Sequence, residues 1–171
     1  MSYSTLKQNI QDFLEDQTAG SEEEAAEFFA EQCMQQVLLK VKPLGGQLNV
    51  VLPANKAPIK AAFLTAMNSI KSTGVNTLAN WTPVSTAWGV AVTFPAWPDV
   101  APPAFLHATV GAAAVPAGAA KLADAFSKNE KTSAQVATKF KDAIKIVMDG
   151  VTYVKTNTVS GVTAPGTGLF P

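Results

Sequence analysis

The chain of 171 residues contains no arginine, one cysteine and one histidine. All of its basic residues are lysines, so it lacks the guanidinium group that proteins use to bind phosphates and base edges through paired hydrogen bonds. This absence argues against specific recognition of nucleic acid. The lone cysteine, Cys33, excludes an internal disulfide and a structural zinc site built from cysteines.

Charge is also scarce, at 15% of residues against about a quarter in an average globular protein. Between Lys71 and Lys121 the only charged residue is Asp99. The same segment, 72–120, is rich in proline and contains all three tryptophans. Aromatic residues without charges are typical of the centre of a protein–protein interface. The sequence therefore predicts that partner chains and the protein's own core cover this segment.

No segment has the length of uninterrupted apolar residues that a membrane span needs, because prolines break the charge-poor segment. The N-terminal residues 1–16 are polar and then acidic, unlike a signal peptide. We expect neither a membrane span nor a secretory leader, and synthesis in a cytoplasm.

The charges that are present are unevenly distributed. Eight of the thirteen acidic residues lie within 1–31, where the only lysine is Lys7, and residues 121–155 are rich in lysine. The simpler interpretation is a set of solvated helix faces. The alternative is an electrically polar subunit whose acidic end meets the basic end of a neighbour.

Apolar residues recur at helical spacing in several segments bounded by capping residues and glycines. Ser21 with Glu24, and Thr132 with Gln135, have the spacing of capping boxes. We predict a first helix capped by Ser4 and ending before Gly20, and further helices over 21–42, 58–74, 117–128 and 132–149.

Other segments favour extended structure. Residues 47–53 suit a short strand or extended segment, 151–159 are rich in β-branched residues, and 95–103 are interrupted by proline. Residues 81–94 are ambiguous, because Pro83 can start a helix whereas Val90, Val92 and Phe94 alternate as in a strand. The predicted fold class is mainly α with short β segments (α+β). We expect one helical domain over 1–150, with an extended Pro/Gly-rich middle segment, followed by a C-terminal arm over 151–171.

Residues suited to catalysis are few. His107 lies in an apolar stretch, and Cys33 lies on the apolar stripe of a glutamate-rich helix, where its thiol would be a poor nucleophile. No nucleotide-binding, hydrolase or metal-binding motif is present. We therefore predict a protein that is not an enzyme, with no cofactor and no metal.

The residues that we predict to contact partners are apolar and mostly aromatic: Trp81, Trp88, Phe94, Trp97, Phe105, Tyr153, Leu169 and Phe170. One alternative is a small ligand-binding module or enzyme whose pocket is formed by the three tryptophans and His107. Another is a protein that inserts residues 86–120 into a membrane.

Both termini resemble those of a known group of proteins. The opening MSYSTLKQNIQDFLED, and the closing series TSAQVATKFKDAIKIVMDG, VTYVKTNTVSG and VTAPGTGLFP, resemble small virion proteins of tailed bacteriophages of the T4-like and cyanophage-like groups. The resemblance covers about the first 16 and last 40 residues. It implies a structural component of a tail, baseplate, neck or capsid, whose partners are copies of itself and other virion proteins.

Overall fold

The computed structural model describes residues 2–16, 20–41, 56–91, 94–98, 104–110, 113–127, 132–159 and 162–169. Helices dominate these residues, so the prediction of a mainly helical chain is confirmed. The helices are α1 (Tyr3–Glu15), α2 (Glu22–Val41), α3 (Lys56–Thr73), α4 (Leu78–Ala91), α5 (Ala114–Ala125) and α6 (Ser133–Asp149).

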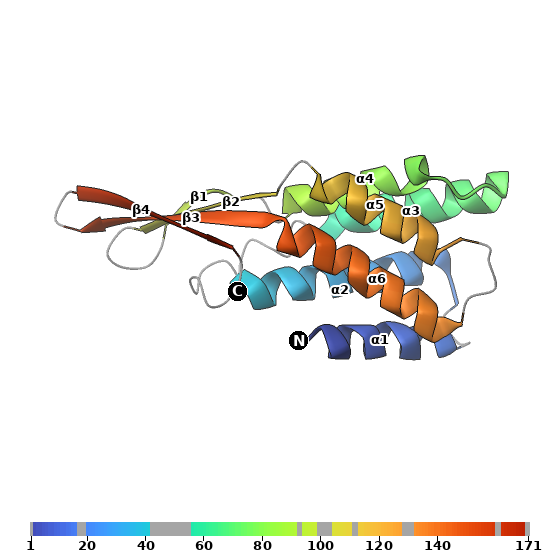
Figure 1. The fold of residues 1–171 in the computed structure, drawn as a ribbon. Helices are drawn as coiled ribbons and strands as arrows, with labels where there is room; N and C mark the ends of the chain where they lie inside the picture. Colours follow the sequence, from blue (N-terminus) through green and yellow to red (C-terminus); the bar gives the residue numbers. More distant parts are fainter. Residues whose placement is uncertain are drawn as a thin grey trace.

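The six helices form a closed bundle, shown on the right of Figure 1. Going round the bundle, each helix packs on the next in the order α1, α6, α5, α4, α3, α2. The ring closes between α1 and α2, where the rings of Phe13 and Phe28 stack with their centroids 3.9 Å apart. The apolar face of every helix therefore turns toward one shared core.

Aromatic rings fill the centre of that core. Phe29 of α2 stacks on Phe140 of α6 and on Phe63 of α3, with centroids 4.9 Å and 5.6 Å apart. Its edge also meets Phe126, which follows α5, at 5.5 Å. All but Phe126 are at most 2% exposed. One cluster of rings thus joins four of the helices, at spacings that favour aromatic pairs.

Helices α5 and α6 approach each other closely through small residues. A Cβ added to Gly118 would lie 2.6 Å from Cγ2 of Val147, and one added to Gly150 would lie 2.4 Å from Cβ of Ala114. These distances are far below normal contact, so glycine is required at both positions.

Capping groups define several helix ends. Thr132 and Gln135 form the predicted capping box at the start of α6, which is confirmed. At α2, Ser21 Oγ accepts from the Glu24 N–H as predicted, but the Glu24 carboxylate accepts from the N–H of Gly20. At α1 the cap is Ser2 and not Ser4, because the helix begins at Tyr3.

Helix α4 differs most from the prediction, because the first part of the charge-poor segment 72–120 is helical and not extended. The helix begins at Leu78, five residues before Pro83, which lies exposed in its interior. Trp81, Val84 and Trp88 fall on its buried side. Burial of this stripe outweighs the backbone hydrogen bond that proline cannot make.

The predicted helix over 117–128 begins three residues earlier, at Ala114, and ends at Ala125. Pro116 lies in its first turn, where proline costs no intrahelical hydrogen bond. The strand that we predicted over 47–53 lies outside the described residues.

The strands β1 (Phe94–Pro98), β2 (Ala104–Val110), β3 (Val151–Val159) and β4 (Val162–Leu169) form an antiparallel sheet in the order β1-β2-β3-β4. Figure 1 shows this sheet extending away from one end of the bundle. Strands β1 and β2 come between α4 and α5, and β3 and β4 follow α6. The chain thus leaves the same end of the bundle twice, and β2 pairs with β3 from Val110↔Val151 outward.

Candidate functional site

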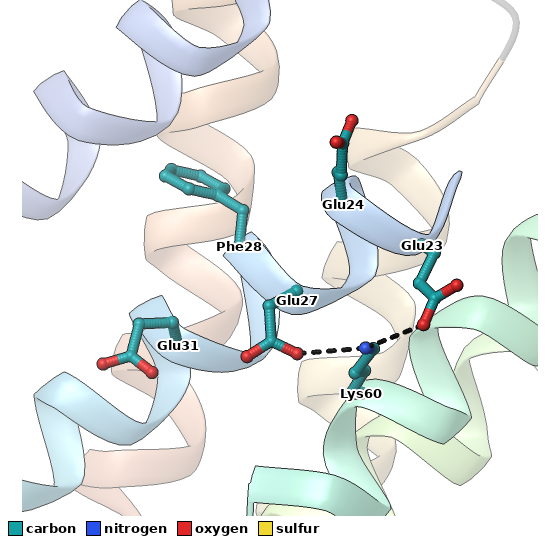
Figure 2. Close-up of a pocket in the computed structure, with 6 residues that line it drawn as sticks. All are labelled: Glu23, Glu24, Glu27, Phe28, Glu31 and Lys60. Carbon is teal, nitrogen blue, oxygen red and sulfur yellow. Dashed lines mark hydrogen bonds and ion pairs between the residues drawn. The ribbon is translucent and has the colours of Figure 1, made fainter. Parts of the chain in front are cut away.

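Two regions of the described structure could serve a function: a charged groove on the bundle and the sheet. The groove lies on the surface of α2 beside α3 and has a volume of about 540 Å³. Figure 2 shows the residues that line it, which are Glu23, Glu24, Glu27, Phe28, Glu31 and Lys60.

Lysines of α3 pair with the glutamates of this groove as a ladder. Lys60 Nζ lies 3.1 Å from a carboxylate oxygen of Glu23 and 3.2 Å from one of Glu27 (Figure 2). One turn earlier in α3, Lys56 Nζ lies 2.5 Å from Glu27 and 3.1 Å from Glu31. Glutamates four residues apart on α2 therefore match lysines four residues apart on α3.

The ladder favours the charged forms of Glu27, Lys56 and Lys60. Hydrogen bonds from Lys56 and Lys60 lower the pKa of Glu27, and the glutamates they contact raise the pKa of both lysines. Glu27 and the two lysines are thus held in their charged forms near neutral pH, whereas a general acid or base needs a pKa close to the working pH. This arrangement suits the alignment of α2 on α3 better than proton transfer.

Among the described residues, no group of three or more histidine, cysteine or acidic side chains could hold a metal ion. Cys33 is 2% exposed, and burial raises the pKa of its thiol far above the usual range. Such a thiol is not a reactive nucleophile.

Trp81 and Trp88 lie in the core of the bundle. Trp81 is 0% exposed, stacks on Phe126 with centroids 4.6 Å apart, and donates its indole N–H to Asn76 Oδ1 at 2.6 Å. Trp88 is 2% exposed. We predicted that these two tryptophans contact partner chains. They lie instead in the chain's own core.

The four residues of the alternative aromatic pocket are divided between the two parts of the molecule. Trp81 and Trp88 lie in the bundle, and Trp97 and His107 belong to strands β1 and β2. A smaller hollow of about 310 Å³ does adjoin Trp81. It is bordered by Met67, Ile70 and Phe126, with the ion pair of Lys71 and Glu22 at its rim.

The sheet gathers most of the remaining predicted contact residues. Phe94 and Trp97 belong to β1, Phe105 to β2, Tyr153 to β3 and Leu169 to β4. Phe170 lies outside the described residues. Lys155 is the one charged residue in the four strands. The sheet is therefore poor in charge, and unlike the uncharged α4 it extends from the bundle, which makes it the stronger candidate site.

One residue of the predicted arm belongs instead to the core. Val151, the first residue of β3, is 0% exposed and packs in the same cluster as Val147 and Met148 of α6. It fixes the base of the sheet to the bundle. In the sequence, the feature that indicates burial of Val151 is its position directly after a helix with an apolar stripe.

No family model, characterised protein or solved structure in the comparisons matches this chain. Within the parts of the chain that the structure describes, none of the helices combines the length and the apolar character needed to cross a bilayer.

Proposed function

We propose that the protein is a non-enzymatic structural or assembly component of a tailed-phage virion. It acts by docking onto copies of itself and onto other virion proteins, in a tail, baseplate, neck or capsid. The observation that carries the proposal is the sheet, which bears one charged residue and extends from a bundle whose core is already complete.

The bundle has the features of a scaffold that needs no partner to complete its core. Its six helices bury their apolar stripes against each other, and eleven of the buried core residues come from α2, α3 and α4 alone: Ala26, Phe29, Ala30, Cys33, Met34, Ile59, Phe63, Ala66, Trp81, Val84 and Trp88. The sheet extends beyond this core (Figure 1). A sparsely charged element outside a chain's own core is suited to contact with another chain.

The virion assignment rests on the resemblance of the two termini to small phage virion proteins. It implies synthesis in the host cytoplasm followed by incorporation into the particle. In this proposal the short β segments are the contact element, and residues 151–171 form a docking arm that is anchored to the bundle at Val151. The scarcity of cationic residues in the strands also favours protein partners over nucleic acid.

Purified particles of the phage that encodes the chain provide the test. We expect the chain to co-sediment with particles in a density gradient, at a constant number of copies per particle. An uncharged contact should resist salt, because screening weakens only charge-mediated association. We therefore expect retention from roughly 0.05 M to 1 M NaCl, where the Debye length falls from above 10 Å to about 3 Å.

Two results would contradict the proposal. Absence of the chain from purified particles would remove the virion assignment. Release of the chain at high salt would instead favour the contact between the acidic and lysine-rich ends of neighbouring subunits.

A further inference from the structure

The end of the bundle away from the sheet presents apolar side chains to solvent. Figure 1 shows the turn between α3 and α4 at this end. Among the described residues, three large apolar side chains are exposed, and two of them, Val75 at 54% and Leu78 at 48%, belong to this turn. We name these two the exposed pair. A single exposed apolar residue needs no explanation, whereas two in one turn form a patch of apolar surface that is suited to contact.

Hydrogen bonds hold the turn in one conformation. Asn76, which lies between the two residues of the exposed pair, accepts from Trp81 Nε1 at 2.6 Å and donates to the carbonyl of Ala123 at 2.8 Å. The side chain of Asn80 accepts from the backbone N–H of Thr77 at 2.8 Å. The exposed pair is therefore presented on a fixed backbone. A partner that binds such a turn does not have to order it first, which lowers the entropic cost of binding.

The hollow of about 310 Å³ beside Trp81 lies next to this turn, and we name it the end hollow. The residues that border it are Glu22, Met67, Ile70, Lys71, Trp81 and Phe126. It adjoins the exposed pair because Leu78 and Trp81 are three residues apart in α4, and residues at this spacing share a side of a helix. The two charged residues at its rim, Lys71 and Glu22, pair with each other. An apolar side chain can therefore enter the hollow without leaving a charge unpaired.

Resting on the proposed function, we propose that the exposed pair of one copy enters the end hollow of a second copy, and the reverse, about a two-fold axis. A two-fold contact requires a surface that complements itself. This end of the bundle has both halves of such a surface, because the projecting side chains and the hollow lie beside each other on one chain. The volume of the hollow also exceeds that of a leucine side chain. A second copy is therefore the partner that matches the projection and the hollow together.

This contact would give the chain a second contact surface, at the end of the bundle opposite the sheet (Figure 1). A two-fold contact by itself stops at a pair of copies. A subunit that also docks through its sheet can link neighbours at both ends. The inference therefore adds to the proposed function the means by which copies extend into a larger assembly.

Hydrogen–deuterium exchange at the turn measures this contact separately from the sheet. We follow the peptide 67–82 of the full chain as concentration rises, and the concentration of half-maximal protection gives the dissociation constant. Leu78→Glu places a carboxylate in the apolar contact, where it is strongly disfavoured. Position 78 lies in the first turn of α4, where an acidic residue favours the helix, so the variant should fold. We expect it to raise the dissociation constant at least tenfold.

Thr86→Glu is the matched control for Leu78→Glu. Thr86 is exposed on the same helix, about two turns further along, so the variant adds the same charge away from the contact. We expect it to change the dissociation constant less than twofold. Circular dichroism of both variants verifies that the helices are formed.

A second variant changes the other half of the contact. Met67→Trp fills the end hollow and leaves the exposed pair intact, and alone it should also weaken the contact at least tenfold. In an equal mixture, the Leu78→Glu copy keeps its hollow and the Met67→Trp copy keeps its exposed pair, so one of the two insertions can form. We expect the mixture to associate more tightly than either variant alone, a rescue that damaged folding does not produce. If Met67→Trp does not fold, the comparison of Leu78→Glu with Thr86→Glu decides.

The possible outcomes separate this inference from the proposed function. Protection of the peptide 67–82 that is independent of concentration in the wild type would overturn the inference, and so would equal effects of Leu78→Glu and Thr86→Glu. A mixture of folded variants that associates no more tightly than its components would also overturn it. In each case, incorporation of the chain into particles still supports the function. A chain absent from purified particles would overturn the proposed function, whatever the exchange at the turn.

Discussion

The bundle and the sheet use apolar residues in different ways. In the bundle, apolar positions recur at helical spacing and meet inside one chain, and ion pairs such as those of Lys56 and Lys60 lie at the rim. In the sheet, charges are almost absent although it extends from the bundle. The difference supports the proposal that the bundle is the folded scaffold and the sheet is the contact element.

The largest expected effect is the loss of a ring from the core of the bundle. Phe140 is 0% exposed and stacks on Phe29 and Phe63. Truncation of Phe140 to alanine should lower the free energy of unfolding by about 3–5 kcal/mol, since it removes buried apolar surface and leaves a cavity. Urea unfolding followed by circular dichroism measures this change.

The control for this variant is Val90→Ala, because Val90 of α4 is 67% exposed. Its effect should stay within about 0.5 kcal/mol. If both substitutions cost the same, the core described for the bundle is incorrect.

A smaller effect is expected where α5 and α6 approach each other. Gly118→Ala should destabilise the bundle by about 1–3 kcal/mol, because the new methyl group overlaps Val147. The sign is informative, since alanine favours a helix over glycine by about 1 kcal/mol. Differential scanning calorimetry should show a lower Tm for this variant.

Ala117 is the matched control for Gly118, because it is exposed on the same helix. Ala117→Gly should cost about 1 kcal/mol through helix propensity alone. A Gly118→Ala variant that is more stable than the wild type would show that the two helices are farther apart than described.

The smallest effect concerns the ion-pair ladder. Glu27→Gln should lower the stability by about 0.5 kcal/mol or less at pH 7, since Glu27 is 42% exposed and solvent screens the pair. The pKa of Glu27 is lowered in the folded state. The stabilisation is therefore present above the ordinary value of 4.5 and is lost as the pH falls through the folded-state pKa.

Urea unfolding of Glu27→Gln and the wild type across pH 3–7 tests this dependence. The difference between the two proteins should disappear at the acid end. Glu15→Gln serves as the control, because Glu15 accepts a hydrogen bond from Gln11 and pairs with neither Lys56 nor Lys60. A difference that persists unchanged at low pH would show that ionisation of Glu27 contributes nothing.

The sequence was sufficient to predict the helices that have both caps and an apolar stripe. Helix α6 begins at the capping box of Thr132 and Gln135 and ends at Asp149, before Gly150, and its buried residues Phe140 and Ile144 lie four residues apart. Local hydrogen bonds define such ends, so no knowledge of the partner helix is needed.

Helix α4 could not be predicted in this way. It lacks charges, and Pro83 favours the start of a helix over its interior. The spacing of Trp81, Val84 and Trp88 was the available signal for a buried stripe. Residues of α4 are helical because packing against the neighbouring helices buries Trp81, Val84 and Trp88.

The candidate site was only partly predictable. The scarcity of charge identified the segment that contains β1 and β2, yet it could not separate Trp81 and Trp88, which complete the core, from Trp97 in a strand. The pairing of Lys56 and Lys60 with glutamates of α2 depends on which helices are neighbours. Sequence spacing alone does not determine that.

Hydrogen–deuterium exchange at several protein concentrations tests most directly whether the sheet is the contact element. We predict that peptides from 94–110 and 151–169 become more protected as concentration rises, whereas peptides from α6 keep the same protection, because α6 belongs to neither proposed contact. Sheet peptides whose exchange is independent of concentration, while the chain still associates, would contradict the account.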